Sequence, residues 1–201
     1  GVLAAGNRAM IKPSEFTPAT SALMAEMIAE TYDPTEVAIF DGGPEVGQAF
    51  SSLPFDHMIF TGATSIARHI LAAAARNLVP VTLELGGKSP CVVESDANIK
   101  VAARRIAMTK FSNAGQMCVA PDYVLVHEAV KDKLLDALKE TLPRLFSEKP
   151  EESYNYGKII NEKQFNRIAG YLSNGTTLYG GRTDKERLFI EPTILTDVMP
   201  D

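Results

Sequence analysis

Residues 57–87, HMIFTGATSIARHILAAAARNLVPVTLELGG, decide the fold class of this chain. A short apolar run, HMIFTG (57–62), ends at a glycine, and a second apolar run, VPVTLELGG (79–87), ends at two glycines. Between them, SIARHILAAAAR (65–76) is rich in residues that favour helices. A strand, a helix and a strand joined by short connections predict a parallel pair with a right-handed crossover. The sequence therefore predicts an α/β fold.

The same alternation precedes this stretch. A helix is predicted over 17–32, because Pro18 suits the first helical position after a Thr17 cap. Its apolar residues recur at helical spacing and predict one apolar face; they are Ala19, Leu23, Met27 and Ile28. A strand is predicted over 36–40, before a glycine-rich turn that opens a short helix. This part of the chain therefore has the organisation of a second strand–helix unit.

The alternation also continues downstream. Strands are predicted over 89–95 and 123–126, helices over 97–112, 128–146 and 161–173, and a loop over 147–156. The end of the chain, 188–198, reads as a strand interrupted at Pro192. LGGKSP (85–90) is the best candidate for a boundary between two α/β units. We expect two consecutive units rather than an internal repeat.

Composition and charge exclude several classes of function. The 201 residues carry a net charge of −5 and form no basic stripe, so nucleic acid is not an expected partner. No apolar run approaches the roughly 20 residues that span a bilayer, and no signal peptide is evident. Two distant cysteines and three scattered histidines give neither a disulfide framework nor a zinc motif. We expect a cytoplasmic protein with no bound metal and no membrane segment.

Two glycine turns are candidate nucleotide sites. AIFDGGPEVG (38–47) and MIFTGATSIA (58–67) both place glycine where an apolar strand passes into a helix. Free amides at a helix N-terminus favour anionic groups, and glycine lets a ligand approach the backbone. Neither stretch is GxGxxG, so an ordinary strand–helix turn is the alternative. Lys12 and Glu15 likewise suit either sugar hydroxyls or a solvated turn.

Two residues are candidates for the chemistry itself. Glu84 interrupts an apolar strand, where burial would raise its pKa and make it a base; the alternative is a strand-end carboxylate facing water. Cys118 follows a polar turn and precedes an apolar run. It is either an exposed nucleophile or a small buried hydrophobe. A cysteine–histidine dyad has no local support, and no GxSxG elbow is present.

Together these stretches resemble the aldehyde dehydrogenase superfamily over essentially the whole chain. The motifs occur in order: KPSE (12–15), FTGATSIA (60–67), LELGGKSP (83–90) and NAGQMCVAPDYVLV (113–126), and PTILTDV (192–198) follows near the end. The cysteine follows the glutamate by 34 residues, which is the usual family spacing. APDYVL looks like the branch with class 3, fatty aldehyde and coniferyl aldehyde enzymes, and the coniferyl aldehyde group is the most similar.

The resemblance implies a role for each matching residue. Cys118 matches the catalytic nucleophile and Glu84 the general base. The matches to cofactor-binding positions are Lys12 and Glu15 at the adenosine ribose, Gly43 and Gly47 near the adenine and its phosphates, Gly62, Ala63 and Ile66 beside the pyrophosphate, and Leu85 and Gly86 near the nicotinamide. The family's fold implies a Rossmann-type NAD(P) domain, of which residues 1–86 are the C-terminal part. Residues 87–201 are then the N-terminal part of an α/β catalytic domain.

The implied activity is oxidation of an aromatic or medium-to-long-chain aldehyde to the acid. A Cys118 thiohemiacetal gives up hydride to the nicotinamide, and Glu84 activates water against the thioester. NAD is the expected cofactor because Glu15 would repel a 2′-phosphate, with NADP as the alternative. The family also implies a homodimer.

The chain departs from the family pattern at two positions. Ala63 replaces a serine and Ala67 a glycine of the pyrophosphate turn. The family's oxyanion asparagine and its EEIFGP glutamate are expected outside this chain, which then looks like a central segment. The alternatives are a non-catalytic nucleotide-binding module and a CoA-acylating enzyme, although a base beside the thioester favours hydrolysis.

Overall fold

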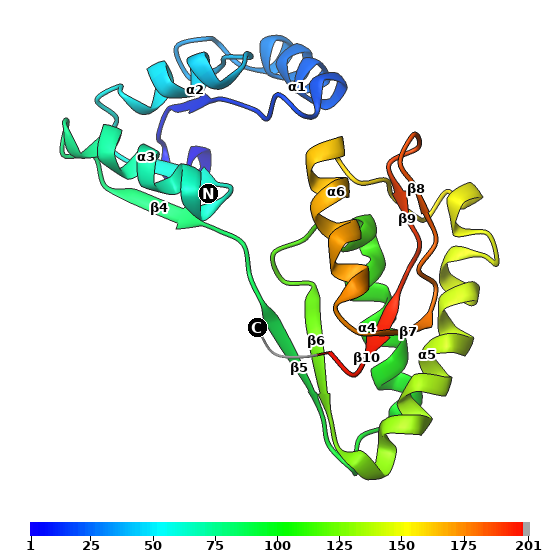
Figure 1. The fold of residues 1–201 in the computed structure, drawn as a ribbon. Coiled ribbons are helices and arrows are strands. Elements are labelled where there is room, and N and C mark those ends of the chain that lie inside the picture. The colour runs from blue at the N-terminus through cyan, green and yellow to red at the C-terminus, as the bar shows by residue number, and fades with distance from the viewer. Residues whose placement is uncertain (199–201) are drawn as a thin grey trace. The chain divides into compact units, whose positions relative to one another are not determined.

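The computed structural model describes residues 1–198, which form two compact units, Gly1–Leu85 and residues 86–198 (Figure 1). The α/β class predicted from residues 57–87 is confirmed, because strands and helices alternate through the first unit and the first part of the second.

The first unit contains two parallel strand pairs with helices in the connections. Its elements are η1 (Leu3–Ala5), β1 (Ala9–Ile11), α1 (Pro18–Thr31), β2 (Val37–Ile39), α2 (Pro44–Ser51), β3 (Met58–Thr61), α3 (Thr64–Ala75) and β4 (Val81–Glu84). β1 pairs with β2, and β3 pairs with β4. A small core forms where Met58, Ala74 and Val79 pack together. The crossover predicted over 57–87 is therefore the β3–α3–β4 segment.

The apolar face predicted for the first long helix is not a buried face. In α1, Leu23 and Met27 are 56% and 58% exposed, and Ser21 is the buried residue. The Ser21 hydroxyl donates to the carbonyl of Ser14 at 3.0 Å, which joins the helix to the preceding turn. Helical spacing predicted the helix correctly, but burial needs a covering element, and the described residues supply none for this face.

The second unit begins with a parallel pair covered by two long helices (Figure 1). Its elements are β5 (Ser89–Val93), α4 (Ile99–Phe111), η2 (Ser112–Gly115), β6 (Pro121–Val126), η3 (Glu128–Val130), α5 (Lys131–Phe146), η4 (Pro150–Glu152), α6 (Glu162–Gly170), η5 (Tyr171–Ser173), β7 (Thr176–Tyr179), β8 (Thr183–Asp184), β9 (Phe189–Ile190) and β10 (Ile194–Thr196). The core lies between β5, α4 and α5; its buried members are Val93, Ala103, Ile106, Ala107, Phe111, Leu134, Leu138, Leu142 and Phe146.

The last third of the chain adds antiparallel pairing that the sequence did not predict. β10 pairs with β7, and β8 pairs with β9. The strand predicted over 188–198 is divided at Pro192 into β9 and β10, each with a different partner. A side-chain cluster supports this region: Arg182 contacts Glu151 at 3.0 Å and Glu191 at 2.9 Å.

Within residues 1–198, no helix has both the length and the apolar character that crossing a bilayer requires.

Candidate active site

The first group of predicted cofactor residues gathers at one edge of the β1–β2 pair. Because the pair is parallel, the carboxyl ends of both strands lie at the same edge. Lys12 follows β1, and its Nζ lies 2.8 Å from Glu15 Oε2. A Cβ added to Gly47 would lie 3.9 Å from Lys12 Cε, which is ordinary contact. The structure therefore brings Lys12, Glu15 and Gly47 together.

The Lys12–Glu15 pair fixes the charge of this edge. A hydrogen bond from Lys12, with a smaller contribution from the backbone, holds the pKa of Glu15 below its ordinary value. Glu15 is therefore ionised at neutral pH. A fixed carboxylate beside a ribose accepts hydroxyl hydrogen bonds and repels a phosphate on the same sugar.

The glycine turn after β2 is shaped by its own side chains. Gly42 has φ 148°, and a Cβ there would collide with the Val46 side chain, so glycine is required. Gly43 is the N-cap of α2. Its N–H donates to Glu45 Oε1 at 3.1 Å, and the Gly42 N–H donates to Asp41 Oδ1 at 2.8 Å. In this structure the first amides of the turn thus have carboxylate partners of their own.

The second glycine turn has an open helix start. The Gly62 N–H donates to the Glu84 carbonyl at 3.0 Å, and Thr61 is the register partner of Glu84 across the β3–β4 pair. Ala63 is the N-cap of α3 and makes no side-chain cap hydrogen bond. The helix start therefore offers uncapped amides, which suit an anionic group such as a pyrophosphate.

Three further predicted residues lie around this edge. Ile66 is exposed in the first turn of α3, whereas Ala67, which replaces a family glycine, is only 2% exposed. Leu85 is half-buried directly after β4. Gly86 is exposed, and a Cβ there would meet no atom within 4 Å. Gly62, Ala63, Ile66 and Glu84 thus share one edge of the first unit.

Glu84 is exposed at the end of β4, which agrees with the strand-end alternative. Burial therefore gives no independent reason for a base at this position. The role of Glu84 as a base rests on the motif that surrounds it.

Cys118 is an exposed free thiol in a turn of the second unit. The Ala120 N–H donates to the Met117 carbonyl at 3.1 Å and closes this turn. The Cys118 carbonyl accepts a hydrogen bond from Ser89 Oγ at 3.3 Å. A Cβ on Gly87 would lie 2.5 Å from the same carbonyl oxygen, so the chain approaches Gly87 too closely for any side chain. Exposure excludes the buried-hydrophobe alternative in this structure.

The segment before the thiol is backbone of unusual conformation. Asn113, Ala114 and Gly115 have φ values of 50°, 52° and 77°, so three consecutive residues lie in the left-handed region. A non-glycine residue in that region costs about 1–2 kcal/mol. Strained backbone of this kind persists only where surrounding contacts hold it, and it gathers at functional sites.

The cationic side chain of Lys110 lies close to this segment. A Cβ on Gly115 would be 3.7 Å from Lys110 Nζ, and the same ammonium lies 3.9 Å from Asp122 Oδ1. Burial lowers the pKa of Lys110, with Lys88 adding to the effect and Asp122 opposing it. The Lys110–Asp122 pair therefore lies close to Gly115, at the end of the left-handed segment.

Sequence reasoning did not single out Gly87, Lys110, Gln116 or Asp122. A signal existed for the left-handed segment, because asparagine and glycine both tolerate positive φ. For the long-range contacts of Gln116 no local signal existed, since Lys158 and Ile160 lie 42 and 44 residues away.

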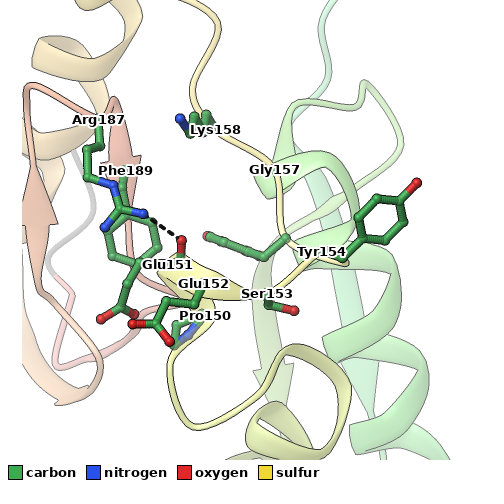
Figure 2. Close-up of a pocket in the computed structure, with 10 residues that line it drawn as sticks. Pro150, Glu151, Glu152, Ser153, Tyr154, Gly157, Lys158, Arg187 and Phe189 are labelled. Atoms are coloured by element: carbon green, nitrogen blue, oxygen red, sulfur yellow. Dashed lines mark hydrogen bonds between the residues drawn. The ribbon is translucent and has the colours of Figure 1, made fainter.

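A shallow pocket in the second unit is separate from these residues. It has a volume of about 250 Å³ and is lined by side chains that include Tyr154, Lys158 and Arg187 (Figure 2). Arg187 donates to the Glu151 carbonyl at 2.9 Å across it. None of the predicted site residues lines this pocket. Among residues 1–198, no group of three or more His, Cys, Asp or Glu is placed to hold a metal ion.

Comparison with known proteins supports the resemblance to aldehyde dehydrogenases over the whole chain. The profile of the Aldehyde dehydrogenase family matches residues 1–201. The 4,4'-diaponeurosporen-aldehyde dehydrogenase of Staphylococcus aureus is 46% identical over 203 residues, covering 100% of this chain and 44% of that protein. A probable coniferyl aldehyde dehydrogenase of Caulobacter vibrioides is 45% identical, with 100% and 43% covered. The dimeric NADP-preferring aldehyde dehydrogenase of Rattus norvegicus is 42% identical, with 100% and 44% covered.

Solved structures of aldehyde dehydrogenases have the same fold as this chain. The substrate-bound state of Staphylococcus aureus AldH has a TM-score of 0.92 at 46% identity, covering 98% of this chain and 43% of that one. An aldehyde dehydrogenase of Mycobacterium tuberculosis complexed with NAD+ has a TM-score of 0.85 at 32% identity, with 98% and 43% covered. The chain thus spans less than half the length of these relatives. The predicted resemblance, including that to coniferyl aldehyde dehydrogenases, is confirmed, and the chain belongs to the aldehyde dehydrogenase family.

Proposed function

We propose that the protein oxidises an aldehyde to a carboxylic acid with NAD(P), and that Cys118 is the nucleophile. The observation that carries the proposal is the exposed Cys118 thiol in a chain of this family. The thiol lies on a turn that closely follows the strained backbone of Asn113 and Ala114. The Cys118 thiolate adds to the aldehyde carbon and gives a thiohemiacetal. A bound NAD(P) would supply the acceptor for the hydride that this carbon loses. The resulting thioester is hydrolysed by water that Glu84 deprotonates, and the thiolate leaves with the acid released.

Residues of the first unit fit the cofactor. Lys12 and Glu15 would bind the adenosine ribose, with Gly43 and Gly47 near the adenine and its phosphates. The start of α3 after Ala63 would bind the pyrophosphate with its amides, since the Ala63 N-cap makes no side-chain cap hydrogen bond. Gly62, whose own N–H donates to the Glu84 carbonyl, would lie in the turn beside it. Ile66, Leu85 and Gly86 complete the set proposed for cofactor binding. The ionised Glu15 favours NAD over NADP.

We also propose that residues 1–86 are the C-terminal part of the NAD(P)-binding domain and 87–201 the N-terminal part of the catalytic domain. The division of the structure between Leu85 and Gly86 supports this assignment. The relatives' names include 4,4'-diaponeurosporen-aldehyde and coniferyl aldehyde, and the second supports an aromatic aldehyde as substrate, with a medium- or long-chain aliphatic aldehyde as the other proposed class. A cytoplasmic homodimer is the proposed assembly.

The test is substitution of Cys118 by alanine in the full-length protein. The variant is expected to bind NAD but to produce no NADH from coniferyl aldehyde or from a medium-chain aliphatic aldehyde. Replacement of Cys91, the other free and half-buried thiol, is the matched control and should leave turnover in place. Retained turnover in Cys118→Ala would overturn the proposal.

A further inference from the structure

The side-chain amide of Gln116 joins the Cys118 turn to a segment more than 40 residues later. Gln116 Oε1 accepts from the Ile160 N–H at 2.9 Å. Gln116 Nε2 donates to the Lys158 carbonyl at 2.9 Å and to the Asn113 carbonyl at 3.0 Å. The amide oxygen and the amide nitrogen are therefore both engaged, and each has a backbone partner.

These contacts have the pattern of a strand pairing. The carbonyl of Lys158 and the N–H of Ile160 point to the same side of an extended segment, as they would toward a neighbouring strand. On the other side, the Ile159 N–H donates to the Leu188 carbonyl at 2.9 Å. Figure 2 shows Gly157 and Lys158 on this segment. The Gln116 amide therefore stands in for a peptide group, which requires one donor and one acceptor in a plane.

The partner segment is itself anchored. Ile159 is 3% exposed and packs with Phe165 and Ile190. Ala114, in the left-handed stretch, packs against the same cluster. The strained residues before the thiol are thus held at two points, by the Ala114 methyl group and by the Gln116 amide. Only the Gln116 amide fixes the orientation of the turn through hydrogen bonds, because the apolar contact of Ala114 has no directional requirement.

We propose that Gln116 is a positioning residue for Cys118, acting through the backbone of the turn rather than by touching the substrate. The donor–acceptor pattern of its amide holds the turn in the arrangement in which the thiol is reactive. This inference rests on the proposed function only in taking Cys118 as the nucleophile.

Two substitutions separate the hydrogen-bond pattern from the shape of the side chain. Gln116→Glu has nearly the same shape, but its carboxylate places a second acceptor against the carbonyls of Lys158 and Asn113, which repel it. When the introduced carboxyl is protonated it again has one donor and one acceptor, the pattern of the amide. Gln116→Met has a similar length and cannot make either bond at any pH.

The assay is alkylation of the Cys118 thiol by iodoacetamide in the full-length protein without cofactor. The rate is read by mass spectrometry of the peptide that carries Cys118, from about pH 8 down to about pH 5, a window that approaches the ordinary carboxyl pKa. Gln164→Glu is the matched control. The Gln164 oxygen only accepts from Arg167 at 2.8 Å, and glutamate keeps that acceptor.

At pH 8 both Gln116 variants should be alkylated about tenfold more slowly than the wild type, as expected when the hydrogen bonds that position the turn are lost. As pH falls, the ratio of the Gln116→Glu rate to the wild-type rate should rise toward one. The Gln116→Met ratio and the Gln164→Glu ratio should stay constant. A merely structural role would lower both Gln116 ratios without any pH dependence.

Wild-type rates in Gln116→Glu at pH 8 would overturn the inference, and so would a Gln116→Glu ratio that does not recover while the protein remains folded by circular dichroism. The assay does not use an aldehyde or NAD. A failure here is therefore distinguishable from failure of the proposed function, which is read from turnover in Cys118→Ala.

Discussion

The substitution Gly87→Ala places one methyl group against the backbone of the proposed nucleophile. The added Cβ would lie 2.5 Å from the Cys118 carbonyl oxygen, 3.6 Å from its carbonyl carbon and 3.4 Å from Ser89 Oγ. The obstructing atom is backbone and not the end of a flexible side chain. Relief therefore requires the turn itself to move.

The size of that movement follows from the contact distances. Ordinary contact begins at 3.4 Å, so the carbonyl must retreat by about 0.9 Å. The retreat also strains the hydrogen bond from Ser89 Oγ to the same oxygen, which is 3.3 Å long. Overpacking of this kind costs about 1–3 kcal/mol of folding free energy. A shift of about 1 Å at a reacting group reduces the rate about a hundredfold.

The measurement is made on the full-length protein in two ways. Urea unfolding gives the change in free energy of unfolding, and iodoacetamide gives the alkylation rate of Cys118. Gly170→Ala is the matched control, because Gly170 lies at the end of α6 with φ −61° and a Cβ there would meet no atom within 4 Å. This control should be neutral or more stable by about 0.4–1 kcal/mol, since alanine restricts the unfolded chain.

Gly87→Ala should lose stability, alkylate at least about tenfold more slowly and lose aldehyde turnover by about a hundredfold. A variant with wild-type stability and a wild-type alkylation rate would refute the close approach of Gly87 to the Cys118 carbonyl. A variant that loses stability but keeps full turnover would refute the link between the position of this turn and reactivity.

Three further outcomes are expected. Glu84→Gln should preserve the first burst of NADH while steady turnover falls by about 10²-fold or more, because only hydrolysis needs the base; equal losses in both phases would argue against that role. Arg182→Gln should lower the melting temperature at neutral pH by removing the hydrogen bonds that hold the pKa of Glu151 below its ordinary value. The stability that Glu151 contributes is complete above the pKa of the unfolded carboxyl and is lost as pH falls through the pKa of the folded one. The difference in melting temperature between Arg182→Gln and the wild type should therefore shrink in acid. A difference that grows in acid would contradict the assignment. Leu142→Ala should cost about 2–5 kcal/mol of unfolding free energy, because Leu142 of α5 is 1% exposed in the core that α5 shares with α4. An unchanged urea midpoint would be inconsistent with that packing.

Local pattern predicted the strand–helix–strand units with accuracy. Residues 57–87 contain an apolar run, a helix-forming run and a second apolar run, and each became one element. In α4, apolar residues such as Ala103 and Ile106 recur at helical spacing, and they are buried. Spacing succeeds here because the partners of these residues lie in adjacent elements of the same unit. It failed for the face of α1, because spacing does not reveal whether a face is covered.

The antiparallel pairs near the end of the chain were beyond sequence reasoning. β8 and β9 have two residues each, too few for a period of two to be visible. β7 pairs with β10 across a register irregularity between Ile194 and Leu195. Pairings of this kind depend on which edges remain free after the longer elements have packed, and composition does not encode that.

The sequence by itself determined the α/β class and the family, and it singled out the residues that we propose carry the chemistry. It did so because the glycine turns, Glu84 and Cys118 occupy short motifs whose meaning is local. Only the tertiary structure decided that Gly87 faces the Cys118 carbonyl and that the Gln116 amide pairs with Lys158 and Ile160. Those contacts join residues 31 to 44 positions apart in the chain. A hydrogen bond or a steric limit between such residues exists only after the backbone has folded, so no single stretch of sequence contains it.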